Sequence, residues 1–381
     1  MFRDLPELSS SIALVLALFC GCGAKTDLLL EAARDAAADS TAPDAGERTD
    51  DRRRLSMSWD HACAIVDRGR VRCWGYNALG LVGETDELRA SPTEVPGLSD
   101  VVEVATGQLV SCALDGNGRV WCWGDVLGSR TPLEVTSLPP AERLFVGSAT
   151  ICIISAVGLV ACTGQSFFSG GFCTPPVADT SLDGSWQPSV TDVVDLAIGQ
   201  RHACAARSDG SVWCWGCEEM LELGSPGPRD HTDPVRVEGV SAVHLAAETN
   251  ATCAWTDRED VWCWGDGSQF GVSLTILPVS PRQVSFGATP VDLDVGVVST
   301  CSGVGDEVVC LGSTYDFPTC TNRWNGRVAF DLPEVREVSI GYMDMCARDA
   351  QGRVWCWGCN QTGAVGDGST TGHAVPFEVP L

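Results

Sequence analysis

A pair of cysteines separated by nine or ten positions recurs seven times along the chain. Around the second cysteine, the sequence Val-Trp-Cys-Trp-Gly appears in four of the repeats, whereas the third and sixth repeats are degenerate. A period of about 40 to 50 residues is typical of propellers and solenoids. We therefore expect seven structural units. The pairs are Cys63 with Cys73, Cys112 with Cys122, Cys152 with Cys162, Cys204 with Cys214, Cys253 with Cys263, Cys301 with Cys310, and Cys346 with Cys356.

The spacing within each pair fits a β-hairpin with the cysteines directly opposite each other. Such residues lie close enough for a disulfide, so we expect one cross-strand disulfide per repeat. Buried free thiols are the alternative. The third loop position, which needs a left-handed backbone, is glycine in five repeats. These glycines are Gly69, Gly118, Gly158, Gly210 and Gly352.

Two repeats depart from this turn pattern. Glu259 replaces the glycine in the fifth repeat, which predicts a strained turn or a different turn type. The sixth repeat is one residue shorter, and a two-residue turn at Gly305 and Asp306 would keep its cysteines opposed.

Two further strands flank each predicted hairpin. The upstream strand ends in glycine five residues before the first cysteine in five repeats, but Ser58 and Glu248 stand there in the first and fifth. The downstream strand carries a Pro-x-x-Val segment. Four strands per repeat predict an all-β, seven-bladed β-propeller with four-stranded blades. We expect 376–379 to close the ring by completing the sheet that begins near Leu55.

Tryptophans alternate with valine and cysteine in the repeated motif, so both faces of this strand are apolar. Blades stack face to face, and such a strand is expected between two neighbours. We therefore interpret the tryptophans as core residues rather than as a platform for sugars.

The chain has 20 cysteines and a net charge of −25. The acidic charge excludes nucleic acid as an expected partner. The cysteine content favours an oxidising compartment. An apolar stretch from Ser11 to Phe19 is too short to span a bilayer and is typical of a signal peptide.

The sequence after this stretch predicts lipid attachment at Cys22, which follows the small residue Gly21, as in the bacterial lipoprotein cleavage box. Ordinary secretion is the alternative. We thus expect a lipoprotein signal peptide at 1–21, a lipidated cysteine and disordered tether at 22–54, and a propeller at 55–381. The protein would be exported and anchored by lipid alone to the bacterial envelope, at the outer membrane.

The motif from His202 to Gly216 resembles the regulator of chromosome condensation repeat, and the segment Asn360–Gly368 is similar to the family's Asn-x-x-Gly-x-Leu-Gly-x-Gly run. The resemblance covers about residues 55 to 381 and is greatest to bacterial secreted members with paired cysteines. It implies a seven-bladed propeller. The nucleotide-exchange and chromatin roles of the eukaryotic founder are not expected here, because the chain is acidic and exported.

Four cysteines remain outside the seven pairs: Cys173, Cys217, Cys320 and Cys359. Because their positions recur, we expect two disulfides between adjacent blades, one joining Cys173 to Cys217 and one joining Cys320 to Cys359. The last residue of each pair also forms a Cys-x-x-Cys motif with a hairpin cysteine. A redox role is disfavoured, since that hairpin cysteine already has a partner.

No catalytic residue, metal site or cofactor is predicted. His61 and His202 share one repeat position, which favours a structural role. We expect a monomeric, non-catalytic scaffold that binds a protein or glycan at the cell surface. One alternative is an inhibitor of a secreted enzyme, because this repeat family includes a β-lactamase-inhibiting type. Another is a carbohydrate-active lyase or hydrolase, which would need carboxylates or histidines converging at one mouth of the channel.

Overall fold

The computed structural model describes residues 52–83, 88–164, 187–224, 230–256, 260–272, 279–316 and 320–381, and Arg52–Leu381 forms one compact unit. The predicted signal peptide, Cys22 and nearly all of the tether lie outside the described residues, as do Glu259 and Cys173.

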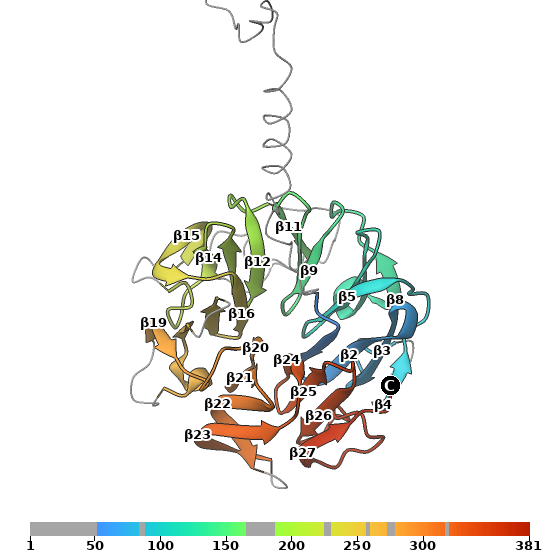
Figure 1. Ribbon diagram of the computed structural model, residues 1–381. Helices are drawn as coiled ribbons and strands as arrows, with labels where there is room; N and C mark the ends of the chain where they lie inside the picture. The colour runs from blue at the N-terminus through green and yellow to red at the C-terminus, as the bar shows by residue number, and fades with distance from the viewer. Residues whose placement is uncertain are drawn as a thin grey trace, which may run out of the picture. The chain divides into compact units, whose positions relative to one another are not determined.

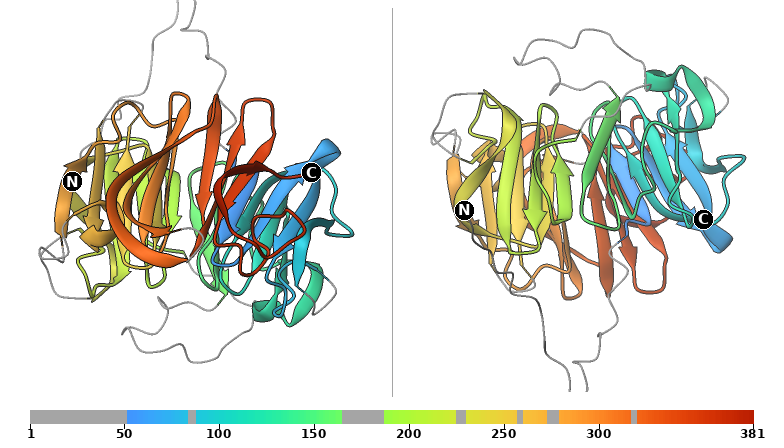
Figure 2. Two further views of the ribbon diagram at one scale, coloured as in Figure 1. Left: turned by 90° about the horizontal axis from the view of Figure 1, so that it is seen from below. Right: turned by 90° about the horizontal axis from the view of Figure 1, so that it is seen from above.

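Seven antiparallel sheets are arranged in a ring about a central axis (Figure 1), and edge-on views show their strands running from one ring face to the other (Figure 2). Six sheets have four strands. The described part of blade three has three, and 165–186, which follow them, lie outside the described residues. The all-β seven-bladed propeller is thereby confirmed.

Each blade is built from strands that are consecutive in sequence, with the first strand innermost. Blades one to three contain β1 (Leu55–Ser58), β2 (His61–Val66), β3 (Arg70–Gly75), β4 (Arg89–Glu94); β5 (Val101–Thr106), β6 (Ser111–Asp115), β7 (Val120–Gly124), β8 (Ser129–Glu134); and β9 (Arg143–Val146), β10 (Thr150–Ile154), β11 (Val160–Gly164). Blades four and five contain β12 (Val193–Ile198), β13 (His202–Arg207), β14 (Ser211–Cys217), β15 (Asp230–Ser241); and β16 (His244–Glu248), β17 (Ala251–Trp255), β18 (Val261–Gly265), β19 (Val279–Val284). Blades six and seven contain β20 (Asp292–Val295), β21 (Ser299–Val304), β22 (Glu307–Asp316), β23 (Thr321–Asp331); and β24 (Val335–Ile340), β25 (Asp344–Asp349), β26 (Val354–Gly358), β27 (His373–Glu378). Short 3-10 turns occur at η1 (Asp67–Gly69), η2 (Asp125–Leu127) and η3 (Gly267–Phe270).

The second and third strands of every blade form the expected cysteine hairpin. In all seven the two cysteines are directly opposed and disulfide-bonded, with Cα atoms 4.0 to 4.2 Å apart. One cross-strand disulfide per blade is therefore present. The bonds join Cys63 to Cys73, Cys112 to Cys122, Cys152 to Cys162, Cys204 to Cys214, Cys253 to Cys263, Cys301 to Cys310, and Cys346 to Cys356.

The hairpin turns follow the glycine pattern. Gly118 has φ +80° at the third loop position, and the other four predicted turn glycines also have positive φ. In blade six Val304 pairs with Glu307, which confirms the two-residue turn. The shorter repeat thus keeps the same strand register as the others.

The ring does not close as the sequence suggested. The last strand, β27, pairs with β26 and completes blade seven, while blade one is already complete from β1 to β4. The expectation that 376–379 finish the sheet begun near Leu55 is wrong, because every repeat supplies its own innermost strand first and leaves none over. Closure instead uses side chains: the Trp74 indole of blade one donates to the Ala364 carbonyl of blade seven at 2.8 Å.

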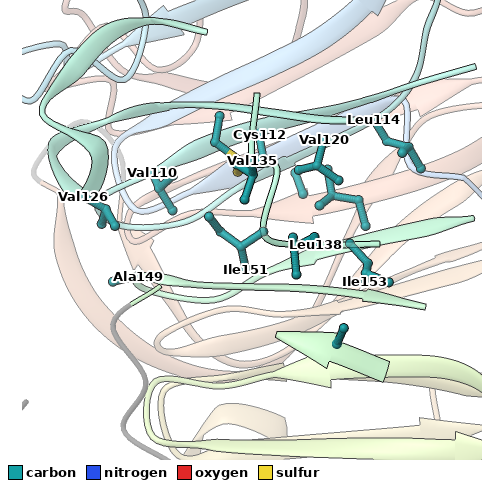
Figure 3. Packing of buried hydrophobic residues seen from close by; sticks show 14 residues of the cluster. Val110, Cys112, Leu114, Val120, Val126, Val135, Leu138, Ala149, Ile151 and Ile153 are labelled. Carbon is teal, nitrogen blue, oxygen red and sulfur yellow. A yellow bond between two sulfur atoms is a disulfide. The ribbon is translucent and has the colours of Figure 1, made fainter. Parts of the chain in front are cut away.

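This closing contact repeats the contacts used elsewhere in the ring. Trp123 donates to Leu81 O, and Trp264 donates to Glu222 O, each at 2.7 Å and each reaching the preceding blade. Seven clusters of buried apolar residues fill the seven blade interfaces. Figure 3 shows the cluster between blades two and three, where Val120 and Ile151 pack. All seven interfaces are thus filled by apolar residues, and three of them also share the indole hydrogen bond.

The two tryptophans of the repeated motif differ in environment. The second is fully buried, as at Trp357, whereas the first is half-buried. The half-buried Trp355 lies beneath the Arg353 guanidinium, 5.2 Å from the ring centroid, and its indole donates to Asp349. Both tryptophans therefore serve the scaffold.

Candidate functional site at one mouth of the central channel

The innermost strands line the channel, and one repeat position there is polar in every blade. It lies four residues before the end-of-strand glycine position. A single sheet position that is charged or histidine in seven of seven blades indicates a shared electrostatic role. We call these residues the belt: Arg54, Glu103, Arg143, Asp195, His244, Asp292 and Glu337.

The four acidic members of this belt hold neighbouring blades together. Each carboxylate accepts a backbone N–H from the next blade at 2.8 to 3.0 Å. Glu103, for example, accepts from Leu144 N and also pairs with Arg143 at 3.2 Å. Burial raises the pKa of Glu103, although Arg143 opposes this shift. The four belt carboxylates therefore join neighbouring blades by hydrogen bonds, and we call these contacts clamps.

Every belt carboxylate also has a cationic group within 4.0 Å. Arg143 lies 3.9 Å from Asp195, and Arg348 lies 3.9 Å from Glu337. Arg53, which precedes β1, has its guanidinium 3.8 Å from the carboxylate of Asp292. The negative charge of the belt is thus locally compensated.

The histidines at the shared repeat position are structural, as their recurrence suggested. His61 Nε2 lies 2.9 Å from Ser111 Oγ in the next blade, and His202 Nε2 lies 2.7 Å from Thr252 Oγ1. Burial lowers the pKa of each histidine to about 4. Both rings are therefore neutral at pH 7 and fasten adjacent blades.

The turns after the innermost strands surround one mouth of the channel. Five contain the repeat's glycine, whereas Ser58 and Glu248 replace it in blades one and five. In these two blades the following residue is left-handed, with φ +45° at Trp59 and φ +42° at Thr249, whereas none of the five glycines has positive φ. Each such residue carries a backbone cost of about 1 to 3 kcal/mol.

The two exceptional turns meet although blades one and five are not neighbours. The side chain of Trp59 lies close enough to Glu248 to lower the pKa of that carboxyl by hydrogen bonding, against the larger effect of burial. The indole also stacks on Tyr342 of blade seven, with ring centroids 5.6 Å apart and planes inclined by 21°. Tyr342 N donates to Trp59 O at 2.8 Å. Gly341 permits this approach, because a Cβ there would collide with Trp59 O.

The acidic groups beside Trp59 lack the close ion pairs found in the belt. Burial, together with repulsion from Asp294, raises the pKa of Glu248 to about 7. Burial likewise raises the pKa of Asp294 to about 6, although Arg53 opposes this shift. Within the described ranges, neither carboxylate forms an ion pair within 4.0 Å. We call Trp59, Glu248, Asp294 and Tyr342 the mouth cluster.

Family models for the "Regulator of chromosome condensation (RCC1) repeat" match residues 53–80, 101–125, 193–220 and 351–381. The chain carries regulator of chromosome condensation repeats. Among curated proteins, these repeats are similar to "RCC1 domain-containing protein RUG3, mitochondrial" of Arabidopsis thaliana, with 24% identity over 61% of this chain and 58% of the relative. The "Ultraviolet-B receptor UVR8" of the same plant is 23% identical over 85% of this chain and 69% of its own.

Solved structures show the same fold. Human WBSCR16 superposes with a TM-score of 0.70 and 17% identity, covering 82% of this chain and 94% of that one. Prp20p from Saccharomyces cerevisiae gives a TM-score of 0.68 and 20% identity, covering 86% and 88%. The chain spans less than two thirds of the first curated relatives, including 26% of Protein pim1 of Schizosaccharomyces pombe.

The cysteines predicted from sequence form scaffold disulfides, and Cys359 lies near the mouth cluster, where its N–H donates to Met343 O beside Tyr342 at 3.1 Å. Cys320 and Cys359 form a disulfide between blades six and seven, with Cα atoms 5.6 Å apart. Cys217 is disulfide-bonded, and its predicted partner Cys173 lies outside the described residues. These cysteines therefore crosslink the scaffold.

Sequence reasoning missed the mouth cluster, although its signal was visible. The absence of glycine at Ser58 and Glu248 marked both turns, but sequence could not show that they touch. Within the part of the chain that the structure describes, no group of three His, Cys, Asp or Glu side chains could hold a metal ion. None of the described helices is long and apolar enough to cross a membrane.

Proposed function

We propose that this protein is an exported lipoprotein whose propeller is a non-catalytic scaffold for a protein or glycan partner at the cell surface. The anchor would be a lipid on Cys22 at the outer membrane, joined to the ring through the tether. The lipoprotein-like sequence around Gly21 and Cys22 and the high cysteine content support this placement.

The observation that carries the binding role is the mouth cluster. Seven apolar interfaces hold the ring together, and the two inner turns that break the repeat lie together at one mouth. Binding residues are commonly found on loops positioned by a rigid scaffold. The belt carboxylates are occupied in clamping the blades, and Asp294 likewise accepts the backbone N–H of Ile340 in blade seven at 2.9 Å, so Glu248 is the mouth carboxyl group that the clamps do not use.

Related propellers support the same class of function. The structure of Prp20p is described together with its binding to Gsp1p and histones, and yeast RCC1 has been crystallised bound to Kap60. Those partners belong to those proteins. What we carry over is only the use of this propeller as a protein-binding scaffold.

The proposal is tested by crosslinking and capture with the full-length, C-terminally tagged protein in its own cell envelope. The matched control replaces the exceptional turn with the turn of blade two, through Ser58→Gly and Trp59→Gln. We expect the wild type to capture a partner that the control loses while remaining folded. Capture of the same proteins by both forms, or of none by the wild type, would contradict the proposal.

A further inference from the structure

The mouth cluster lies at the two turns where the repeat's glycine is replaced, by Ser58 and by Glu248, and it contains aromatic and acidic side chains. Five blades make the inner turn with glycine and no strain, so the fold itself does not require left-handed backbone at Trp59 and Thr249. Strained backbone that a simpler repeat sequence would avoid is typical of functional sites. The contact between Trp59 and Glu248 unites both departures in one place.

The mouth cluster contains aromatic and acidic side chains. Trp59 and Tyr342 form a stacked pair, and both side chains are half-buried rather than sealed in the core. Beside them Glu248 and Asp294 repel each other without a cation within 4.0 Å among the residues described, whereas each belt carboxylate has one. The mouth therefore places two carboxyl groups without a close ion-pair partner next to an indole, and a bound cation would favour their ionised form.

We propose that the mouth cluster binds an arginine or lysine side chain of a partner protein. This inference rests on the proposed scaffold function and names its contact surface. A cation over an indole face is attracted by the ring quadrupole, and tryptophan is the most favourable ring for this interaction. The neighbouring carboxylates supply the complementary charge, while phosphates and other anions are repelled.

The location of the cluster suits a surface contact. Trp59 lies where β1 turns into β2, on the ring face opposite the cysteine-hairpin turns. Arg53 and Arg54 lie at the start of β1, on the hairpin-turn face, where Arg54 O accepts from Ile65 N. A partner at the mouth cluster would therefore approach the ring face opposite the hairpin turns.

Calorimetric titration of the full-length protein with a glycine–arginine repeat peptide tests the site. The reference probe is the glycine–citrulline peptide, which has nearly the same shape but no charge. Glu248→Gln removes the ionisable carboxyl group yet keeps an oxygen that can accept a hydrogen bond from Trp59. Glu142→Gln is the matched control, because this glutamate precedes β9 at the opposite mouth.

We expect the arginine peptide to bind the wild type, and Glu248→Gln to weaken binding about tenfold. Glu142→Gln should have little effect, and the citrulline peptide should not bind. Tyr342→Leu provides a second variant on the other side of Trp59. Thermal unfolding of each variant shows that the ring is intact.

Three results would overturn the inference: equal weakening by Glu142→Gln, equal binding of the citrulline peptide, or binding of N-acetylglucosamine oligomers that depends on Trp59 when the arginine peptide does not bind. The scaffold function is judged separately. If the envelope partner is lost by the variant with Ser58→Gly and Trp59→Gln but is still captured by Glu248→Gln and by Tyr342→Leu, the cation site is wrong and the scaffold function stands.

Discussion

The buried histidine clamp predicts a defined loss of stability in acid. His202 is fully buried, and burial holds its pKa at about 4 instead of the ordinary 6.5. As pH falls below 6.5 the unfolded chain binds a proton at this ring, whereas the folded protein does so only near pH 4. The free energy of unfolding therefore decreases between pH 6.5 and 4.

The size of this decrease follows from the difference in pKa. A shift of 2.5 units, from 6.5 to about 4, corresponds to about 3 kcal/mol at 1.36 kcal/mol per unit. Other groups act in the opposite direction. Burial raises the pKa of Glu248 and Asp344 to about 7, so these acids stabilise the fold as pH falls from 7. A difference between variants removes their contribution.

The assay is guanidinium unfolding of wild type and His202→Asn, with disulfides intact, at several values between pH 7 and pH 4. We expect the stability of the wild type relative to the variant to fall by about 3 kcal/mol across this range. Thr252→Val removes the partner of the ring and should cost about 1 to 3 kcal/mol without abolishing the pH dependence. A difference that is flat or rises toward pH 4 would refute the assignment of a buried neutral histidine.

Three further predictions concern the anchor and the scaffold. Cys22→Ser should move the protein from the membrane to the soluble fraction and abolish labelling with a fatty-acid analogue, whereas Cys20→Ser should change neither; membrane retention of the first variant would contradict lipidation. Thr300→Val should be neutral or stabilising by about 1 kcal/mol in thermal unfolding, because Thr300 Oγ1 is buried without a hydrogen-bond partner, in contrast to Thr252. Replacing both cysteines of the disulfide between blades six and seven by serine should lower the free energy of unfolding by about 4 kcal/mol, because these cysteines are 39 positions apart. Replacing both cysteines of a hairpin disulfide should lower it by about 3 kcal/mol. If denaturant unfolding gave the reverse order, the loop-entropy explanation would be contradicted.

Sequence predicted the blades well because their defining contacts are local. The turn between Cys112 and Cys122 fixes the strand register within eleven residues, and Gly118 needs only its own backbone conformation. Likewise, the shortening at Gly305 could be matched to a two-residue turn by counting residues. Hairpin geometry is therefore readable from spacing alone.

Ring closure was not predictable by the same means. The repeat can be divided so that either the upstream strand or the downstream strand begins a blade, and sequence spacing is identical in both cases. The structure selects the first division: β1 starts blade one and β27 ends blade seven. The choice depends on which interfaces can be filled, as by Trp74 against Ala364, and these contacts join residues 290 positions apart.

The mouth cluster could not be predicted from the sequence, because only the folded ring shows that its two exceptional turns lie together. In sequence, Ser58 and Glu248 are two separate losses of glycine, 190 positions apart, and each alone would be read as a less favourable turn. Closure of seven blades brings the loops that follow them to one mouth, where the indole of Trp59 can reach across two intervening blades to Glu248. Because five unstrained turns in the same ring show that glycine would serve the fold, the strain at Trp59 and Thr249 is explained by what these turns place together and not by the architecture that carries them.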